Sequence, residues 1–170
     1  MTGTRWLDDE EQEAWRTYLY GSRVLLDSLD RHLQREAGMP HTYYGILAAL
    51  SEAPERSLTM TQLAELTRAS PSKVSHAMNR LEDRGWVRRR RCSSNARQIL
   101  GTLTDQGYDI LVEAAPRLVS QVRNALFDVL SPGQVTQLRD IFHAVLVNLE
   151  DRPLGCDPVL APDPDAEVPR

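Results

Sequence analysis

The side chains best able to bind a charged ligand gather in one stretch, residues 68–97. This stretch holds nine Lys and Arg side chains against only Glu82 and Asp83, a local charge of +7, whereas the whole chain has a net charge of −4. Guanidinium and ammonium groups attract phosphate. A cationic patch on an otherwise acidic chain therefore indicates nucleic-acid binding at one surface, rather than indiscriminate coating of nucleic acid.

A helix is expected to begin in this stretch, because Ser70 is a good N-cap and Pro71 suits the first helical position. The spacing i, i+3, i+4, i+7 predicts that the helix buries Val74, Ala77, Met78 and Leu81. The opposite side, which we call the polar face, then presents Ser72, Lys73, Ser75, His76 and Asn79. Short polar side chains near a helix N-terminus can approach base edges, and the N-terminus itself favours a phosphate.

A two-stranded hairpin is predicted after this helix. Gly85 suits the position just past a helix C-terminus, and Trp86 opens a strand that contains four consecutive arginines, Arg88–Arg91. A second strand returns at about residues 98–103, with Ile99 and Leu103 on one face. The major groove admits one helix and a hairpin tip reaches the neighbouring minor groove, so the pair has the dimensions of a reader of double-stranded DNA. Alternate side chains of a strand face opposite ways, so only some of the four arginines are expected to contact phosphate.

Two shorter helices are predicted to support this pair. Residues 42–52 form a mostly buried helix, followed by a turn-rich loop at 51–57. Thr59 and Gln62 have the spacing of a capping box, so a further helix begins there and completes a helix-turn-helix with the helix that starts at Ser70. Its inward side chains are expected to be Leu63, Ala64 and Leu66.

Long helices are predicted on both sides of this unit, over about residues 8–36, 104–130 and 131–150. The first carries a heptad stripe, and so does the last. Pro116 is expected to kink or break the middle one. The heptad stripes consist of Trp15, Leu19, Ser22, Leu26, Leu29 and Leu33 in the first helix and of Val135, Leu138, Phe142, Val145 and Leu149 in the last. The predicted inward residues of the middle helix are Leu111, Ala115, Leu118, Val122, Ala125 and Val129. We expect the terminal helices to pack on each other across a dimer, and the proline-rich residues 151–170 to be a disordered tail.

The composition argues against other classes of protein. A chain of 170 residues suits one globular domain and leaves little room for a separate catalytic domain. No Ser/His/Asp order, HExxH motif or phosphate-binding glycine loop stands out, so we expect no enzyme, no cofactor and no metal site. Two cysteines are too few for a disulfide framework. There is neither an apolar run of about 20 residues nor a signal-peptide pattern, and we expect a cytoplasmic protein.

With these features in view, the chain resembles the multiple-antibiotic-resistance regulator (MarR) family over about residues 10–150. The most specific segments are LTMTQLAELTRASPSKVSHAMNRLEDRGWVRRR and LGTLTDQGYDIL. The resemblance implies a mainly α-helical fold with a small β-wing, that is, a winged helix-turn-helix at about 42–104 with dimerisation helices at about 8–36 and 104–150, all in one domain over 1–150. It also implies a homodimeric transcription factor that reads a pseudo-palindromic operator, most often a repressor released by a small aromatic or lipophilic ligand.

The resemblance also implies roles for individual residues. The polar face matches recognition contacts, Arg80 and Arg84 match phosphate-facing residues, and Arg97 matches a wing-tip arginine that enters the minor groove. The family commonly has an aspartate two residues before that arginine, where this chain has Asn95, so the wing is expected to be held differently. The complete predicted DNA-binding set is Ser70, Ser72, Lys73, Ser75, His76, Asn79, Arg80, Arg84, Arg89, Arg91, Asn95 and Arg97.

Several alternatives remain open at this point. Cys92 follows four arginines, which makes it either a redox-sensitive thiol or simply a small strand residue. Tyr18, His41 and Tyr44 are candidates for an effector pocket, or else core packing. A winged helix is also able to grip another protein without binding DNA, although that use does not require the charge of the 68–97 stretch.

Overall fold

The computed structural model describes residues 3–91 and 98–149. Within these ranges the chain is mainly α-helical, with one small antiparallel sheet. The helices are α1 (Asp9–Ala37), α2 (His41–Glu52), α3 (Met60–Leu66), α4 (Pro71–Asp83), α5 (Asp105–Ala125) and α6 (Pro132–Leu149), and short 3₁₀ turns lie at Pro54–Arg56 and Phe127–Val129. The strands are β1 (Ser57–Thr59), β2 (Val87–Arg91) and β3 (Ile99–Leu103).

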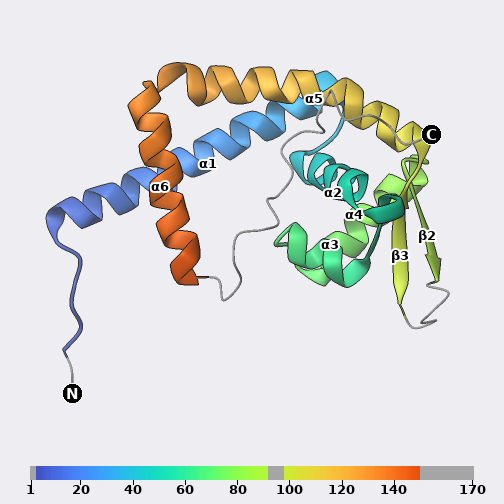
Figure 1. The fold of residues 1–170 in the computed structure, drawn as a ribbon, viewed down its shortest axis with the longest axis horizontal. Helices are drawn as coiled ribbons and strands as arrows, with labels where there is room; N and C mark the ends of the chain where they lie inside the picture. The colour runs from blue at the N-terminus through green and yellow to red at the C-terminus, as the bar shows by residue number, and fades with distance from the viewer. Residues whose placement is uncertain (1–2, 92–97, 150–170) are drawn as a thin grey trace.

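The elements form two regions (Figure 1). Helices α2, α3 and α4 pack together with the sheet, and the β2–β3 hairpin projects from them as a wing. Helices α1 and α5 lie side by side and extend away from this body, and α6 crosses the far part of α1. Helices α3 and α4 followed by the β2–β3 hairpin make the winged helix-turn-helix that the sequence predicts.

The predicted helix starts are confirmed. The Ser70 hydroxyl accepts a hydrogen bond from the Lys73 N–H, and Thr59 with Gln62 forms a complete capping box. Thr104 caps α5 by accepting from the Gly107 N–H. After α4 the chain turns at Gly85, whose φ of +75° is a conformation that other residues rarely adopt. These local contacts fix where each of these helices begins, and they are predictable from the sequence because they join residues three positions apart.

One continuous core lies beneath α4 and joins the two regions. The four side chains predicted on the inner side of α4 are all buried. On α2, the helix predicted to be mostly buried, Tyr44, Ile46, Leu47 and Leu50 are enclosed. The end of α1 and the first half of α5 complete the core, with Leu29, Leu33, Leu111, Ala115 and Leu118 buried as predicted. The core therefore holds α4 against both the sheet and the long helices.

The sheet contains a strand that the sequence pattern did not indicate. β3 lies in the middle, with β2 on one side and β1 on the other. β1 falls where a loop was predicted, because three residues are too few to show an alternating pattern and their pairing is non-local. The Ser57 and Thr102 hydroxyls lie 2.8 Å apart across this pair. Ile99 and Leu103 are four residues apart in β3 and so share one face, as predicted, but Ile99 is exposed at the far end of the strand whereas Leu103 is buried.

The long helices also depart from the predictions. α5 is one helix through Pro116 and ends at Ala125, followed by a 3₁₀ turn instead of further α-helix. Burial of Leu111 and Leu118, on either side of the proline, holds the helix together although Pro116 cannot donate a backbone hydrogen bond. Within this single chain, several residues predicted to form the heptad stripes or to face inward are exposed. They are Trp15, Leu26, Leu66, Val129, Phe142, Val145 and Leu149.

Gly107 of α5 lies close against Trp86, the residue that precedes the first wing strand. A Cβ at this position would overlap the Trp86 carbonyl oxygen and would lie 2.9 Å from Leu103 Cδ1. The Trp86 carbonyl is backbone and cannot rotate away. We therefore expect Gly107→Ala to lower the free energy of unfolding by about 1–3 kcal/mol, the usual penalty of overpacking, despite the better helix propensity of alanine.

Gly45 of α2 provides the matched control, because a Cβ there meets no atom within 4 Å. Gly45→Ala should raise stability by about 0.5–1 kcal/mol. Urea unfolding of both full-length variants at one protein concentration measures these changes. Equal stabilisation by both substitutions would contradict the close approach at Gly107.

Candidate nucleic-acid interface

The polar face of α4 is exposed along its whole length. Ser72, Lys73, Ser75, His76 and Asn79 all lie on the surface, opposite the buried stripe. Within residues 3–91 and 98–149 none of these five side chains makes a hydrogen bond or an ion pair. Their donors and acceptors are therefore available to an external ligand. The Ser70 hydroxyl differs, since it is used as the helix cap.

Three further cations have no partner in the described part of the chain. Arg80 lies on α4, and Arg88 and Arg91 lie on β2, all exposed. Arg90 Nη2 lies 3.9 Å from Glu55 Oε2, but both side chains are well exposed, so this ion pair is weak. Because alternate side chains of a strand face opposite ways, Arg88 and Arg90 lie on one face of β2 and Arg91 on the other, while Lys73 and Arg80 lie on α4.

Arg89 is held inward by Glu82. The Arg89 backbone N–H donates to Glu82 Oε1 at 2.8 Å, and its guanidinium donates to Glu82 Oε2 through Nε at 2.8 Å and through Nη2 at 2.6 Å. These bonds tie the last turn of α4 to the first half of β2, and the hydrogen bonds from Arg89 lower the pKa of the Glu82 carboxyl. We call this pair the wing brace. It was missed in the sequence, where the only signal is an acid on α4 seven residues before a strand arginine.

Arg84 also points away from the polar face. Its Nη1 donates to the Gly38 carbonyl oxygen at 3.0 Å, and its guanidinium carbon lies 4.8 Å from the centre of the Trp86 ring. The structure thus leaves the five polar-face residues and Arg80 exposed on α4 and Arg91 exposed on β2, and it places Arg84 and Arg89 in contacts within the protein. Cys92, Asn95 and Arg97 lie outside the described residues.

The three residues suggested for an effector pocket do not come together. Tyr18 stacks on Trp15 and lies 5.9 Å from the Phe142 ring of α6. His41 lies at the other end of α1, where its backbone N–H donates to Asp30 Oδ1 at 2.8 Å. Twelve residues of helix separate Tyr18 from Asp30, a distance of about 18 Å. Tyr18 therefore belongs to a different site from His41.

His41 and Tyr44 are part of the packing around α2. Burial lowers the pKa of His41, against the opposite effect of Asp30. Burial also raises the pKa of Tyr44 to about 12, and its side chain is enclosed in the core. The packing interpretation of Tyr44 fits this position.

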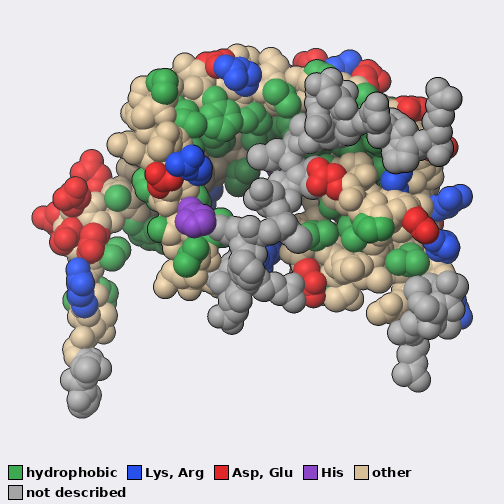
Figure 2. Space-filling view, viewed as in Figure 1, with side chains coloured by type: hydrophobic (Ala, Val, Ile, Leu, Met, Phe, Trp, Pro, Cys, Tyr) green, Lys and Arg blue, Asp and Glu red, His purple; other side chains and the backbone are tan. Residues whose placement is uncertain are grey.

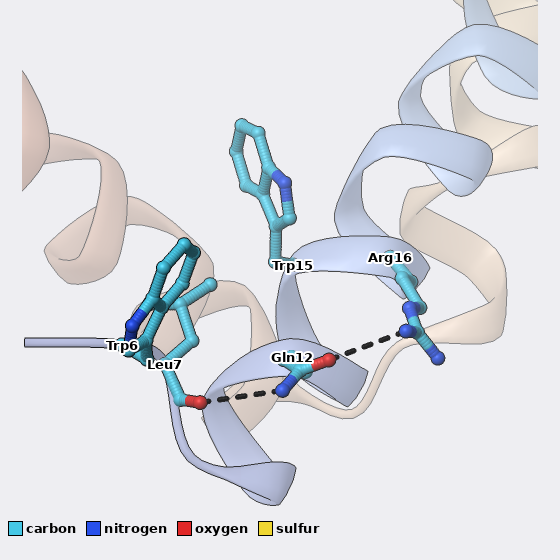
Figure 3. A pocket seen from close by; sticks show the side chains of 5 residues that line it. All are labelled: Trp6, Leu7, Gln12, Trp15 and Arg16. Atoms are coloured by element: carbon cyan, nitrogen blue, oxygen red, sulfur yellow. Dashed lines mark hydrogen bonds between the residues drawn. The ribbon is translucent and has the colours of Figure 1, made fainter.

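A shallow pocket of about 320 Å³ lies instead at the beginning of α1 (Figure 3). Trp6 and Leu7 of the preceding segment face Trp15, while Gln12 bridges the Leu7 carbonyl and the Arg16 guanidinium. All but Gln12 of these lining residues are exposed, so the pocket is a hollow in an open apolar surface.

In residues 3–91 and 98–149 no cluster of three or more His, Cys, Asp or Glu side chains forms a metal site. Nor does any described helix combine the length and the apolarity needed to span a membrane.

Comparison with known proteins finds similarity to one family of transcriptional regulators. Residues 37–98, which include the helix-turn-helix and most of the wing, match the model of the MarR family. Over a larger span, the chain is similar to Sco3205 of Streptomyces coelicolor, a MarR family transcriptional regulator whose crystal structure is in complex with DNA. That similarity has 47% identity and a TM-score of 0.82, and covers 91% of this chain and 97% of that one.

Two other relatives give the same result. AbsC of Streptomyces coelicolor, also a MarR family transcriptional regulator, shares 36% identity at a TM-score of 0.80, over 88% of this chain and all of that one. The transcriptional repressor MprA of Escherichia coli is 25% identical over 135 residues, which is 79% of this chain and 76% of the repressor.

The wing brace generates a prediction about pH. The folded pKa of Glu82 lies below its ordinary value of 4.5, so the unfolded chain takes up this proton first on acidification. The stabilisation from the brace is therefore complete above that value and is lost as the pH falls through the folded pKa. Glu82→Gln should destabilise the chain by up to about 1 kcal/mol at neutral pH, since the pair is partly exposed, and this difference should shrink towards pH 3.

Asp83 serves as the control, because it is an exposed neighbouring carboxyl without a recorded partner among the described residues. Urea unfolding of wild type, Glu82→Gln and Asp83→Asn across this pH range tests the prediction. A difference between wild type and Glu82→Gln that does not change with pH would show that the ionised carboxyl does not hold the wing.

Proposed function

Because this chain belongs to the MarR family of transcriptional regulators, we propose that it binds double-stranded DNA sequence-specifically as a homodimer and represses transcription until a small ligand releases it. Regulation of transcription, and not enzymatic catalysis, is the activity of the family. The proposed unit is a single domain over residues 1–150, with the winged helix at about 42–104 and the dimerisation helices at about 8–36 and 104–150.

The polar face of α4 is the observation that carries the proposal. Five side chains that donate or accept hydrogen bonds stand exposed on one helix, with no partner among the described residues, and cations flank them on α4 and β2. A helix of this kind fits the major groove, while the cations bind phosphates on either side. The DNA complex of the 47% identical Streptomyces coelicolor regulator supports the same use of the fold.

The long helices support the homodimer. None of the 18 residues of α6 is buried within its own chain, although the helix carries Ile141, Phe142, Val145, Val147 and Leu149. Hydrophobic side chains gather where α5 and α6 meet on the face shown in Figure 2. Apolar surface of this extent favours association, at about 25 cal/mol for each Å² removed from water. The proposed partner is a second copy, which places two α4 helices for a pseudo-palindromic operator.

The proposal includes repression of transcription and release by a small ligand. A related protein of Escherichia coli is named a transcriptional repressor, and a dimer bound over a promoter blocks access to it directly. A small aromatic or lipophilic effector remains the proposed signal, in line with the family resemblance. His41 stays a candidate for contacting it, since its half-buried side chain lies where α1 meets α2, whereas Tyr44 is enclosed in the core.

The division between base reading and phosphate binding generates a prediction. After selection of an operator from random DNA, Asn79→Ala should lower discrimination at particular base pairs by about 1–3 kcal/mol, because an amide makes two hydrogen bonds to adenine. Arg80→Ala should instead weaken binding to all DNA and reduce the salt slope by about one unit. Binding to operator and random DNA at several salt concentrations measures both effects. Equal losses on both DNAs for both variants would mean that the surface is only an electrostatic patch.

The dimer generates a second prediction. Ile141 is 60% exposed on α6, and Ile141→Asp should dissociate the dimer because it places a charge in an apolar interface. His143 lies on another side of the same helix, so His143→Asp is the matched control and should leave the dimer intact. Light scattering of the full chain at micromolar concentration gives the mass. A well-folded wild-type monomer under these conditions would refute the homodimer.

A further inference from the structure

We propose that Arg84 is a positioning residue, which fixes α4 against the end of α1. It thereby sets the distance between the two α4 helices, the recognition helices of the proposed dimer. The inference rests on the proposed function and assigns Arg84 a different role from the phosphate contact that the family resemblance implies. The Arg84 side chain binds the end of α1, and α1 carries the exposed side chains of the proposed dimer interface.

The Arg84 side chain joins three elements. Arg84 is the C-cap residue of α4, and its guanidinium donates from Nη1 to the Gly38 carbonyl at the end of α1. The same group lies over the Trp86 ring at the start of the wing and 5.7 Å from the centre of the Tyr43 ring of α2. A planar guanidinium satisfies a carbonyl at its edge while covering an aromatic ring with its face. A phosphate would have to compete with these contacts.

The end of α1 is a natural site for such a clamp. The last carbonyl groups of a helix lack partners within the helix and carry its partial negative charge. Here Arg84 binds the Gly38 carbonyl, and Arg117 of α5 binds the Glu36 carbonyl. Arg117 also pairs with Glu113 at 2.9 Å. Two guanidinium groups from separate elements therefore hold one helix terminus, and the one from α4 connects it to the DNA-facing surface.

α1 connects the Arg84 contact to the proposed dimer interface. It spans 29 residues, which corresponds to about 44 Å of helix, and its far half carries exposed aromatic side chains such as Trp15 and Tyr20. Half-sites read by a dimer lie one helical turn of DNA apart. Any change in the angle between α4 and the end of α1 alters the separation of the two α4 helices, so a loose junction would tolerate operators of incorrect spacing.

The test uses the selected operator and versions with one base pair added to or removed from its centre. Wild-type protein should prefer the selected spacing by at least about tenfold. Arg84→Ala and Arg84→Lys should both lose most of this preference, because lysine keeps the charge but not the planar contact with Trp86. The salt slope should stay unchanged in both. Arg80→Ala is the control and should show the opposite pattern, a lower salt slope with the spacing preference intact.

A second measurement does not depend on DNA. Spin labels at Arg35→Cys on α1 and Ser75→Cys on α4, with the native cysteines replaced by serine and labelled chains diluted into unlabelled protein, report the distance within one chain. Arg84→Ala should broaden this distance distribution, and Arg80→Ala should not. If wild type selects no DNA motif, the proposed function fails while the label distances still test the clamp. An Arg84→Ala variant that behaves as Arg80→Ala does in both experiments overturns the proposal.

Discussion

Burial of one side of α4 is the constraint on which the rest of the structure depends. Met78 and Leu81 are fully enclosed, and Met78 reaches the sheet so closely that a Cβ at Gly101 would lie 2.5 Å from its methyl group. Rotation of α4 about its axis would expose these side chains and bury the polar face, and both changes are unfavourable. The same packing that stabilises the fold therefore decides which side chains face outward.

Charge on this surface is used in two ways. The local charge of +7 suggests a uniform phosphate-binding patch, but Arg89 is held within the protein by a carboxylate and Arg84 by a carbonyl and aromatic rings. Both attach the α4 terminus to a neighbouring element. Arginine suits such attachments because its donors form a rigid, planar array. Some arginines of this stretch are thus free to attract phosphate, while others hold elements of the protein together. Only the partners of each arginine distinguish the two roles.

Which features could be predicted from the sequence depends on how far apart in the chain the contacting residues lie. Helix caps, the buried stripe of α4 and the hairpin were predictable because they depend on residues at most a few positions apart. β1 was not, since its stability comes from pairing with β3 more than 40 residues away. The grouping of Tyr18 with His41 failed because similar residue types do not reveal where along a long helix each one lies. The contacts of Arg84 join segments 46 residues apart, which no local pattern indicates.

The absence of any buried residue in α6 within its own chain has a consequence for how the protein responds to its own abundance. In the proposed dimer the helix acquires its packing only when two chains meet, so the population of complete dimers is second order in chain concentration while monomers are in excess. Occupancy of an operator would then rise with the square of expression level. Such a response acts as a threshold, so that small changes in synthesis or degradation of the chain switch the target more sharply than they would for a monomeric DNA-binding protein.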